Sequence, residues 1–150
     1  MTAPDRSVRP TRTELQAWRT FLRAHARVTR VLEAELVAEQ QLSLGGYDVL
    51  VQLAEAPDHR LRMAELADAV LLSRSGVTRL VDRLERAGMV ARERVPGDGR
   101  GVVATLTARG LDVLRTASRT HLAGVSEHFV ARLSAEQLAY LGELCGKLAD

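Results

Sequence analysis

The chain opens with a long stretch in which apolar residues recur every three or four positions, from residue 13 to residue 40. That spacing places them on one face of an α-helix, and Thr13 is a residue type that caps helix starts. At about 1.5 Å per residue the helix would be on the order of 40 Å long. Its apolar stripe therefore needs a partner beyond one small domain. Residues 1–12 contain two prolines and no periodicity, which predicts a flexible tail.

The following segment predicts a second helix and a short strand. Ser43 is the expected N-cap of a helix over about 43–56, which ends before the turn signal Ala56-Pro57-Asp58. Residues 60–63 then predict one short strand.

A helix-turn-helix pattern occupies the middle of the chain. A two-turn helix over 64–70 is separated by a short turn from a helix over 73–87, with Ser73 as its expected N-cap and Gly88 as its end. In this arrangement the second helix is the one that enters the DNA groove. Its polar positions are left for solvent or DNA, and they are Arg74, Ser75, Thr78, Arg79, Asp82 and Arg83.

The segment after this helix predicts a β-hairpin. Residues 89–95 alternate between two faces as strand residues do, and residues 102–106 form the returning strand. Between them lies the glycine-rich tip 96–101 (PGDGRG), where glycine allows a tight turn. A recognition helix with a hairpin beside it is a winged helix-turn-helix.

Two further helices are predicted at the C-terminus. Thr107 is the expected cap of a helix over about 107–132, and Ser134 with Gln137 forms a capping box that opens the last helix. The fold class is therefore mainly α with a small β part (α+β): a winged helix-turn-helix with a β-hairpin wing and long helices on both sides.

Composition and charge narrow the class of partner. Aromatic residues are only 3% of the chain, which argues against the base-stacking surfaces that bind single strands or RNA. Residues 60–109 hold ten Arg against six acidic residues, whereas each flanking segment has a slight acidic excess. A basic middle third suits a phosphate-binding surface. The lone Cys145 and the lack of a signal-like or membrane-spanning apolar run favour the cytoplasm and predict no membrane contact.

Catalytic and cofactor-binding motifs are lacking in the sequence. It contains no metalloprotease, Walker or nucleophile-elbow motif, and the glycine-rich tip lies between two strands rather than opening a helix. No enzyme activity, cofactor or metal is therefore expected. His121 and His128 are seven residues apart on one helix face, so zinc binding is a minor alternative to surface or interface histidines.

Three blocks of the sequence resemble the MarR (multiple antibiotic resistance regulator) family. Residues 98–110 (DGRGVVATLTARG) resemble its D-x-R…L-T-x-x-G wing signature. Residues 77–92 are similar to its recognition helix and the entry to its wing, and residues 42–50 to its second helix. The blocks occur in the family's order, and the resemblance spans about 13–149.

The resemblance implies a homodimer with two winged lobes. In the family the first and the last two helices interleave around the two-fold axis. Here that would make 13–40 and 108–150 the dimerisation region of a single domain, 13–150, around a winged helix-turn-helix at about 43–107. Two recognition helices about 34–36 Å apart imply double-stranded DNA with a pseudo-palindromic operator.

The resemblance and the helix geometry together select DNA-binding candidates. Residues on the first two turns of the recognition helix reach base edges, and Arg79 is the candidate for a bidentate guanine contact. An alternative is that Arg79 pairs with Asp82 or Glu85. The resemblance makes Arg100 a minor-groove residue, with Asp98 orienting it. The full set is Ser73, Arg74, Ser75, Thr78, Arg79, Arg83, Asp98 and Arg100.

Many members of the family release DNA when a small aromatic or anionic effector binds between the dimer helices and the winged lobe. The candidate lining residues are Trp18, Phe21, His25, Tyr47 and Asp48. The alternative is that Trp18 and Tyr47 are core or dimer-interface residues. The overall prediction is a homodimeric repressor relieved by a small molecule. The second hypothesis is a helical ligand-binding or protein-interaction module without specific DNA binding.

Overall fold

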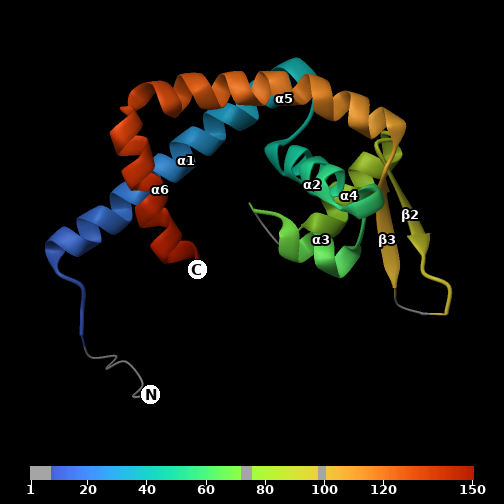
Figure 1. Ribbon diagram of the computed structural model, residues 1–150, viewed down its shortest axis with the longest axis horizontal. Coiled ribbons are helices and arrows are strands. Elements are labelled where there is room, and N and C mark those ends of the chain that lie inside the picture. The colour runs from blue at the N-terminus through green and yellow to red at the C-terminus, as the bar shows by residue number, and fades with distance from the viewer. Residues whose placement is uncertain (1–7, 72–75, 98–100) are drawn as a thin grey trace.

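The computed structural model describes residues 8–71, 76–97 and 101–150 (Figure 1). Two long helices, α1 (Arg12–Gln40) and α5 (Ala108–His128), pack along each other, and the winged lobe lies to one side of them. The last helix, α6 (Ala135–Ala149), follows the short 3-10 helix η2 (Val130–Arg132) at the end of α5. The predicted mainly helical fold with a small sheet is confirmed.

Three of the predicted helix caps are correct, and the cap predicted for α1 is wrong. A side-chain hydroxyl accepts a backbone N–H at the start of three helices, as predicted. Ser43 caps α2 (Leu44–Glu55), Thr107 caps α5 and Ser134 caps α6. The cap of α1, however, is Thr11 and not Thr13. Thr11 Oγ1 accepts the Glu14 N–H at 3.2 Å, and the Glu14 carboxylate accepts the Thr11 N–H at 2.8 Å. A negative carboxylate is favoured at the positive N-terminal end of a helix. The capping box formed by Thr11 and Glu14 therefore fixes the start of α1.

The recognition helix is shorter than predicted. Helix α4 spans Val77–Arg86, and its N-cap is Gly76 with φ 85°, so the predicted start at Ser73 is wrong. Glycine adopts this left-handed conformation without the steric penalty of other residues, and it interrupts the helix that the Ser73 cap predicted. Ser73, Arg74 and Ser75 themselves lie outside the described residues. The helix before it, α3, spans Met63–Ala69.

The wing belongs to a three-stranded antiparallel sheet of order β1-β3-β2. The predicted hairpin is confirmed as β2 (Val90–Arg94) and β3 (Val102–Leu106), which pair from Val90 opposite Leu106 to Arg94 opposite Val102. The short strand predicted from 60–63 is β1 (Arg60–Arg62), which follows the 3-10 helix η1 (Pro57–His59) and pairs with the other edge of β3. Asp98 and Arg100 of the tip lie outside the described residues.

The hydrophobic core lies in the winged lobe and extends under the junction of α1 and α5. The fully buried large side chains come from α1, α2, α3, α4 and β2, and they are Leu36, Val49, Leu50, Leu53, Leu66, Val81 and Val90. The first half of α1 and all of α6 bury no side chain in the single chain. These two segments extend away from the lobe (Figure 1).

Helix α5 ends at His128, four residues before the predicted end, because Phe129 leaves the helical conformation at φ −123°. Among the described residues, the helices all fall short of the length or the apolarity needed to cross a bilayer.

Candidate nucleic-acid interface

Helix α4 presents a polar face away from the core. Val77, Val81 and Leu84 are buried against the lobe. The candidates Thr78, Arg79 and Arg83 are all exposed on the other side. Among the described residues, none forms an ion pair with the guanidinium of Arg79 or of Arg83. This face therefore has two arginines that remain open to an anionic partner.

Arg92 of β2 neutralises the two acidic residues of α4. Its Nη2 lies 2.6 Å from Asp82 Oδ1 and 3.0 Å from Glu85 Oε1, and its backbone N–H donates to Glu85 Oε2 at 3.1 Å. The guanidinium hydrogen bond lowers the pKa of Glu85 and raises the pKa of Arg92. Asp82 and Glu85, which the sequence offered as partners of Arg79, are thus engaged by the wing strand. The alternating pattern of 89–95 indicated a strand but not this contact.

Replacing Arg92 by methionine is expected to lower the Tm by a few degrees and to weaken DNA binding. The substitution disconnects β2 from α4 and leaves two unpaired carboxylates near the DNA-facing side, where they repel phosphates. Thermal denaturation and a gel-shift titration measure the two effects. Arg94→Met is the control for stability, because Arg94 is an exposed residue of the same strand. Equal Tm values for both variants would mean that the Arg92 contacts contribute nothing.

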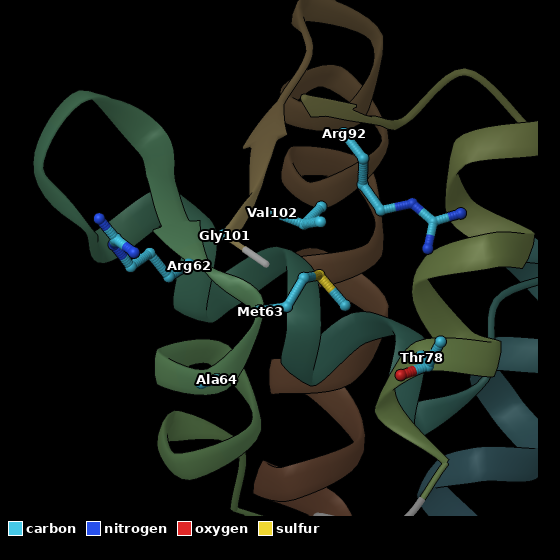
Figure 2. A pocket seen from close by; sticks show the side chains of 7 residues that line it. All are labelled: Arg62, Met63, Ala64, Thr78, Arg92, Gly101 and Val102. Atoms are coloured by element: carbon cyan, nitrogen blue, oxygen red, sulfur yellow. The ribbon is translucent and has the colours of Figure 1, made fainter. Parts of the chain in front are cut away.

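A cavity of about 380 Å³ lies between the start of α3, the start of α4 and the sheet. Figure 2 shows Arg92 extending toward α4 and Arg62 pointing to the opposite side. The surface beside the recognition helix is therefore hollowed, and Thr78 stands at its edge. The lining residues are Arg62, Met63, Ala64, Thr78, Arg92, Gly101 and Val102.

The five candidate effector-binding residues do not share one cavity in this chain. Tyr47 and Asp48 line a cavity of about 350 Å³ between α1, α2 and α5. His25 lines a different cavity, on the side of Arg30 and Gly45. Trp18 and Phe21 line neither of these cavities, and they are 56% and 46% exposed, with ring centroids 6.2 Å apart.

Asp48 and His121 are the notable polar groups of the 350 Å³ cavity. Asp48 is buried, and its carboxylate accepts the Leu71 N–H at 2.7 Å and the Gln52 side chain at 3.2 Å. The His121 ring lies 4.5 Å from the Tyr47 ring, and burial lowers the pKa of His121. Its Nδ1 is buried without a hydrogen-bond partner among the described residues. The packing of His121 against Tyr47 of α2 leaves no pattern in the sequence, so only the structure places His121 in this cavity.

His121 and His128 do not form a common site. His121 belongs to the cavity beside Tyr47, whereas His128 Nε2 lies 2.5 Å from Glu35 Oε1 at the end of α5. The two-histidine arrangement considered from the sequence is therefore not formed.

An exposed cationic helix, preceded by a short helix and flanked by a β-hairpin, defines a winged helix-turn-helix protein. The model of the MarR family matches residues 40–101. Sco3205, a MarR family transcriptional regulator from Streptomyces coelicolor solved in complex with DNA, is 36% identical, with a TM-score of 0.88 over 97% of this chain and 91% of that one. AbsC, a MarR family regulator from the same organism, is also 36% identical, with a TM-score of 0.83 over 95% and 96%.

Curated relatives of similar sequence are also transcriptional regulators of the helix-turn-helix type. An uncharacterised HTH-type transcriptional regulator of Bacillus cereus is 30% identical over 78% of this chain and 76% of its own length. The regulator PecS of Dickeya dadantii is 26% identical over 86% and 77%. The chain belongs to the MarR family of winged helix-turn-helix transcriptional regulators.

Proposed function

We propose that this protein, a DNA-binding transcriptional regulator of the MarR family, acts as a homodimeric repressor on a pseudo-palindromic operator. Helix α4 enters the major groove and the wing tip, 96–101, lies in the minor groove. The observation that carries the proposal is the exposed face of Thr78, Arg79 and Arg83, whose neighbouring acidic residues are both engaged by Arg92. A regulator of this kind works where the chromosome is, in the cytoplasm, and needs no catalytic residue.

The proposed DNA contacts follow from the position of each residue along α4. Thr78 and Arg79 are on the first turn of α4, where side chains reach base edges, and Arg83 is one turn further and suits a phosphate. Arg100 inserts into the minor groove, and Asp98 orients it. Ser73, Arg74 and Ser75 precede the helix and complete the set. The relative Sco3205, solved with DNA, supports this use of the shared fold.

The proposed homodimer covers the two segments that contain no fully buried side chain in the single chain. The first half of α1 exposes Leu15, Trp18, Phe21 and Leu22, and α6 exposes Tyr140, Leu144 and Leu148. Exposed apolar side chains gathered on two extended helices are typical of an interface. The proposed dimerisation region, 13–40 and 108–150, contains both segments, and it leaves the winged lobe, about 43–107, free for DNA.

Light scattering at micromolar concentration is expected to give twice the chain mass of 16.4 kDa. Trp18→Glu should shift the protein toward the monomer, because a carboxylate would be buried in an apolar interface. Thr20→Glu adds the same charge to the same helix about 200° away from Trp18 and should leave the dimer intact. A stable 16.4 kDa wild-type species would contradict the architecture.

A gel-shift titration on the DNA flanking the protein's own gene tests the function. The expected result is submicromolar, salt-sensitive binding that is stronger than to a random duplex of equal length. Equal affinity for both duplexes would exclude a specific repressor. No binding to either would favour the alternative, a helical ligand-binding or protein-interaction module.

We further propose that a small aromatic or anionic effector relieves repression from the cavity lined by Tyr47, Asp48 and His121. Asp48 holds the Leu71 N–H, and Leu71 directly precedes the connection to α4. A ligand whose hydroxyl or N–H group donates a hydrogen bond to this carboxylate, while its other polar group pairs with the unsatisfied His121 nitrogen, would take the place of the Leu71 N–H. Repeating the gel shift with aromatic acids tests this, and release of DNA by none of them would argue against it.

A further inference from the structure

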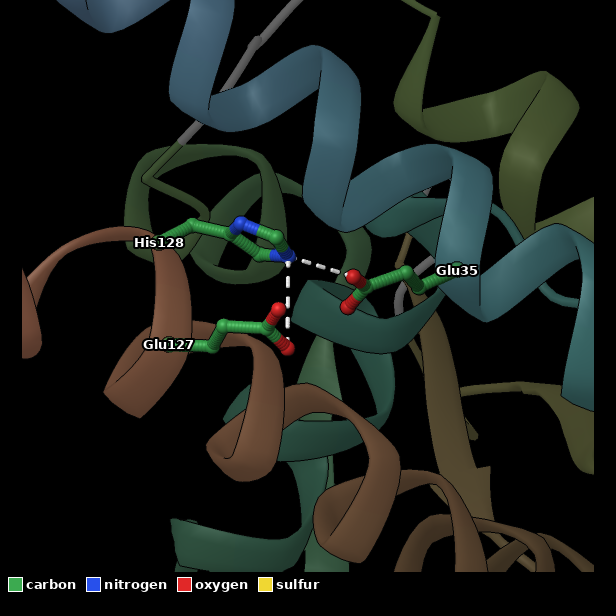
Figure 3. Close-up of side chains that lie close together, drawn as sticks. All are labelled: Glu35, Glu127 and His128. Carbon is green, nitrogen blue, oxygen red and sulfur yellow. Dashed lines mark hydrogen bonds and ion pairs between the residues drawn. The ribbon is translucent and has the colours of Figure 1, made fainter.

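A second cluster of chemically active side chains lies far from the DNA-facing side, where α1 meets the end of α5. His128 Nε2 is 2.5 Å from Glu35 Oε1 and 3.9 Å from Glu127 Oε2 (Figure 3). The side chains of His128 and Glu35 are 21% and 31% exposed, while that of Glu127 is 75% exposed. Three side chains that can ligate a metal ion thus converge from two helices, two of them partly buried and one exposed to solvent.

The close approach of the two helices is what brings Glu35 over α5. Gly124 lies one helical turn before His128, and a Cβ there would be 2.5 Å from Glu35 Oε2 and 2.8 Å from Leu32 Cδ2. Because Gly124 has no side chain, the Glu35 carboxylate lies directly against α5. The close packing of α1 against α5 at Gly124 therefore fixes the position of the Glu35 carboxylate.

We infer that Glu35, Glu127 and His128 form a binding site for a divalent transition-metal ion such as Zn²⁺. Their ligand atoms all lie within 4.8 Å of one another. Zinc binds imidazole nitrogen and carboxylate oxygen at about 2.0–2.2 Å, which puts tetrahedral ligands roughly 3.3 Å apart. Measured from His128 Nε2, the Glu35 oxygen would move outward from 2.5 Å and the Glu127 oxygen inward from 3.9 Å to reach this separation. A water molecule would supply the fourth ligand, since the Glu127 side chain is 75% exposed.

The donor set selects the class of ion. Imidazole nitrogen favours zinc and its first-row neighbours, whereas Mg²⁺ and Ca²⁺ prefer oxygen donors alone. An ion at this place would join α1 to α5 through ligands from both helices. The simpler arrangement, a hydrogen-bonded His128–Glu35 pair without an ion, is the outcome that the experiment must distinguish.

Calorimetric titration of the whole, chelator-treated protein with Zn²⁺ tests the site. The expected result is one ion per chain, with an affinity about 10-fold or more lower in both His128→Gln and Glu127→Gln. Because Glu127 is exposed, its variant should keep the wild-type Tm without metal, so a lost affinity would not reflect unfolding. His59→Gln and Glu143→Gln, at exposed positions outside the cluster, are the matched controls and should bind as the wild type does.

Substituting Co²⁺ adds a spectroscopic readout, since its absorption reports nitrogen coordination, and His128→Gln should change the spectrum. The inference is overturned if the wild type binds no Zn²⁺, or if both cluster variants bind it as tightly as the two controls. Neither readout depends on DNA binding.

Discussion

Gly110→Ala is expected to destabilise the protein by about 1–3 kcal/mol or more. A Cβ at position 110 would overlap the Met89 carbonyl oxygen and would lie 2.7 Å from Leu106 Cδ1. The Met89 backbone cannot easily move away, because its N–H donates to the Leu84 carbonyl at 2.9 Å and its carbonyl accepts the Thr107 N–H at 3.1 Å. This contact joins the end of α4, the start of the wing and the start of α5, so strain there affects the whole winged lobe.

Urea denaturation at fixed protein concentration measures this effect, since the stability of a dimer depends on concentration. Glu55→Ala is the control, because Glu55 is an exposed residue at the end of α2, outside the proposed dimerisation region. Alanine is a good helix former and removes a negative charge from the negative end of the helix, so this control should be neutral or slightly stabilising. Equal stability of the two variants would show that the contact of Gly110 with Met89 tolerates a methyl group.

Arg79→Ala is expected to weaken binding to the cognate operator by about 1–3 kcal/mol and to relax the preference at one base position. Arg79 is exposed on the first turn of α4, and no described acidic residue occupies its guanidinium. A forked guanidinium can make two hydrogen bonds to one guanine, so its removal costs sequence discrimination as well as charge.

Arg79→Lys separates these two contributions. Lysine keeps the charge but cannot form the forked pair, so it should retain affinity for random DNA and lose most of the preference for the operator. Competition gel shifts with operators changed at single positions measure both quantities. If Arg79→Ala weakens cognate and random DNA equally, Arg79 contacts phosphate and not a base.

Local chemistry explains why much of the fold was predictable. Ser43, Thr107 and Ser134 cap the helices that follow them, because a hydroxyl reaches an N–H only three residues away. The alternation over 89–95 and the glycine-rich tip likewise identify the hairpin, since strand periodicity is a property of neighbouring residues. The errors occur where two local signals compete. Thr11 and Thr13 both resemble caps, and Gly76 interrupts the helix that Ser73 would have opened.

The candidate site was predictable only in part. The exposure of Thr78, Arg79 and Arg83 follows from the position of the buried valines on the same helix. The five effector candidates do not share one cavity, because His25 and Tyr47 project from different helices at an angle that the sequence does not contain. The grouping of such residues depends on how the helices pack.

The sequence by itself determined the order of helices and strands, the apolar face of each, and the family to which the chain belongs. Periodicity and capping act over a few residues, so they can be recognised without knowing the packing. Only the tertiary structure decided that Arg92 forms ion pairs with the two acidic residues of α4. It also decided that the Asp48 carboxylate accepts the Leu71 N–H and that Glu35 forms a hydrogen bond with His128. Each of these contacts joins residues on different segments, and its formation depends on helix crossings and strand register that are set by packing of the whole core.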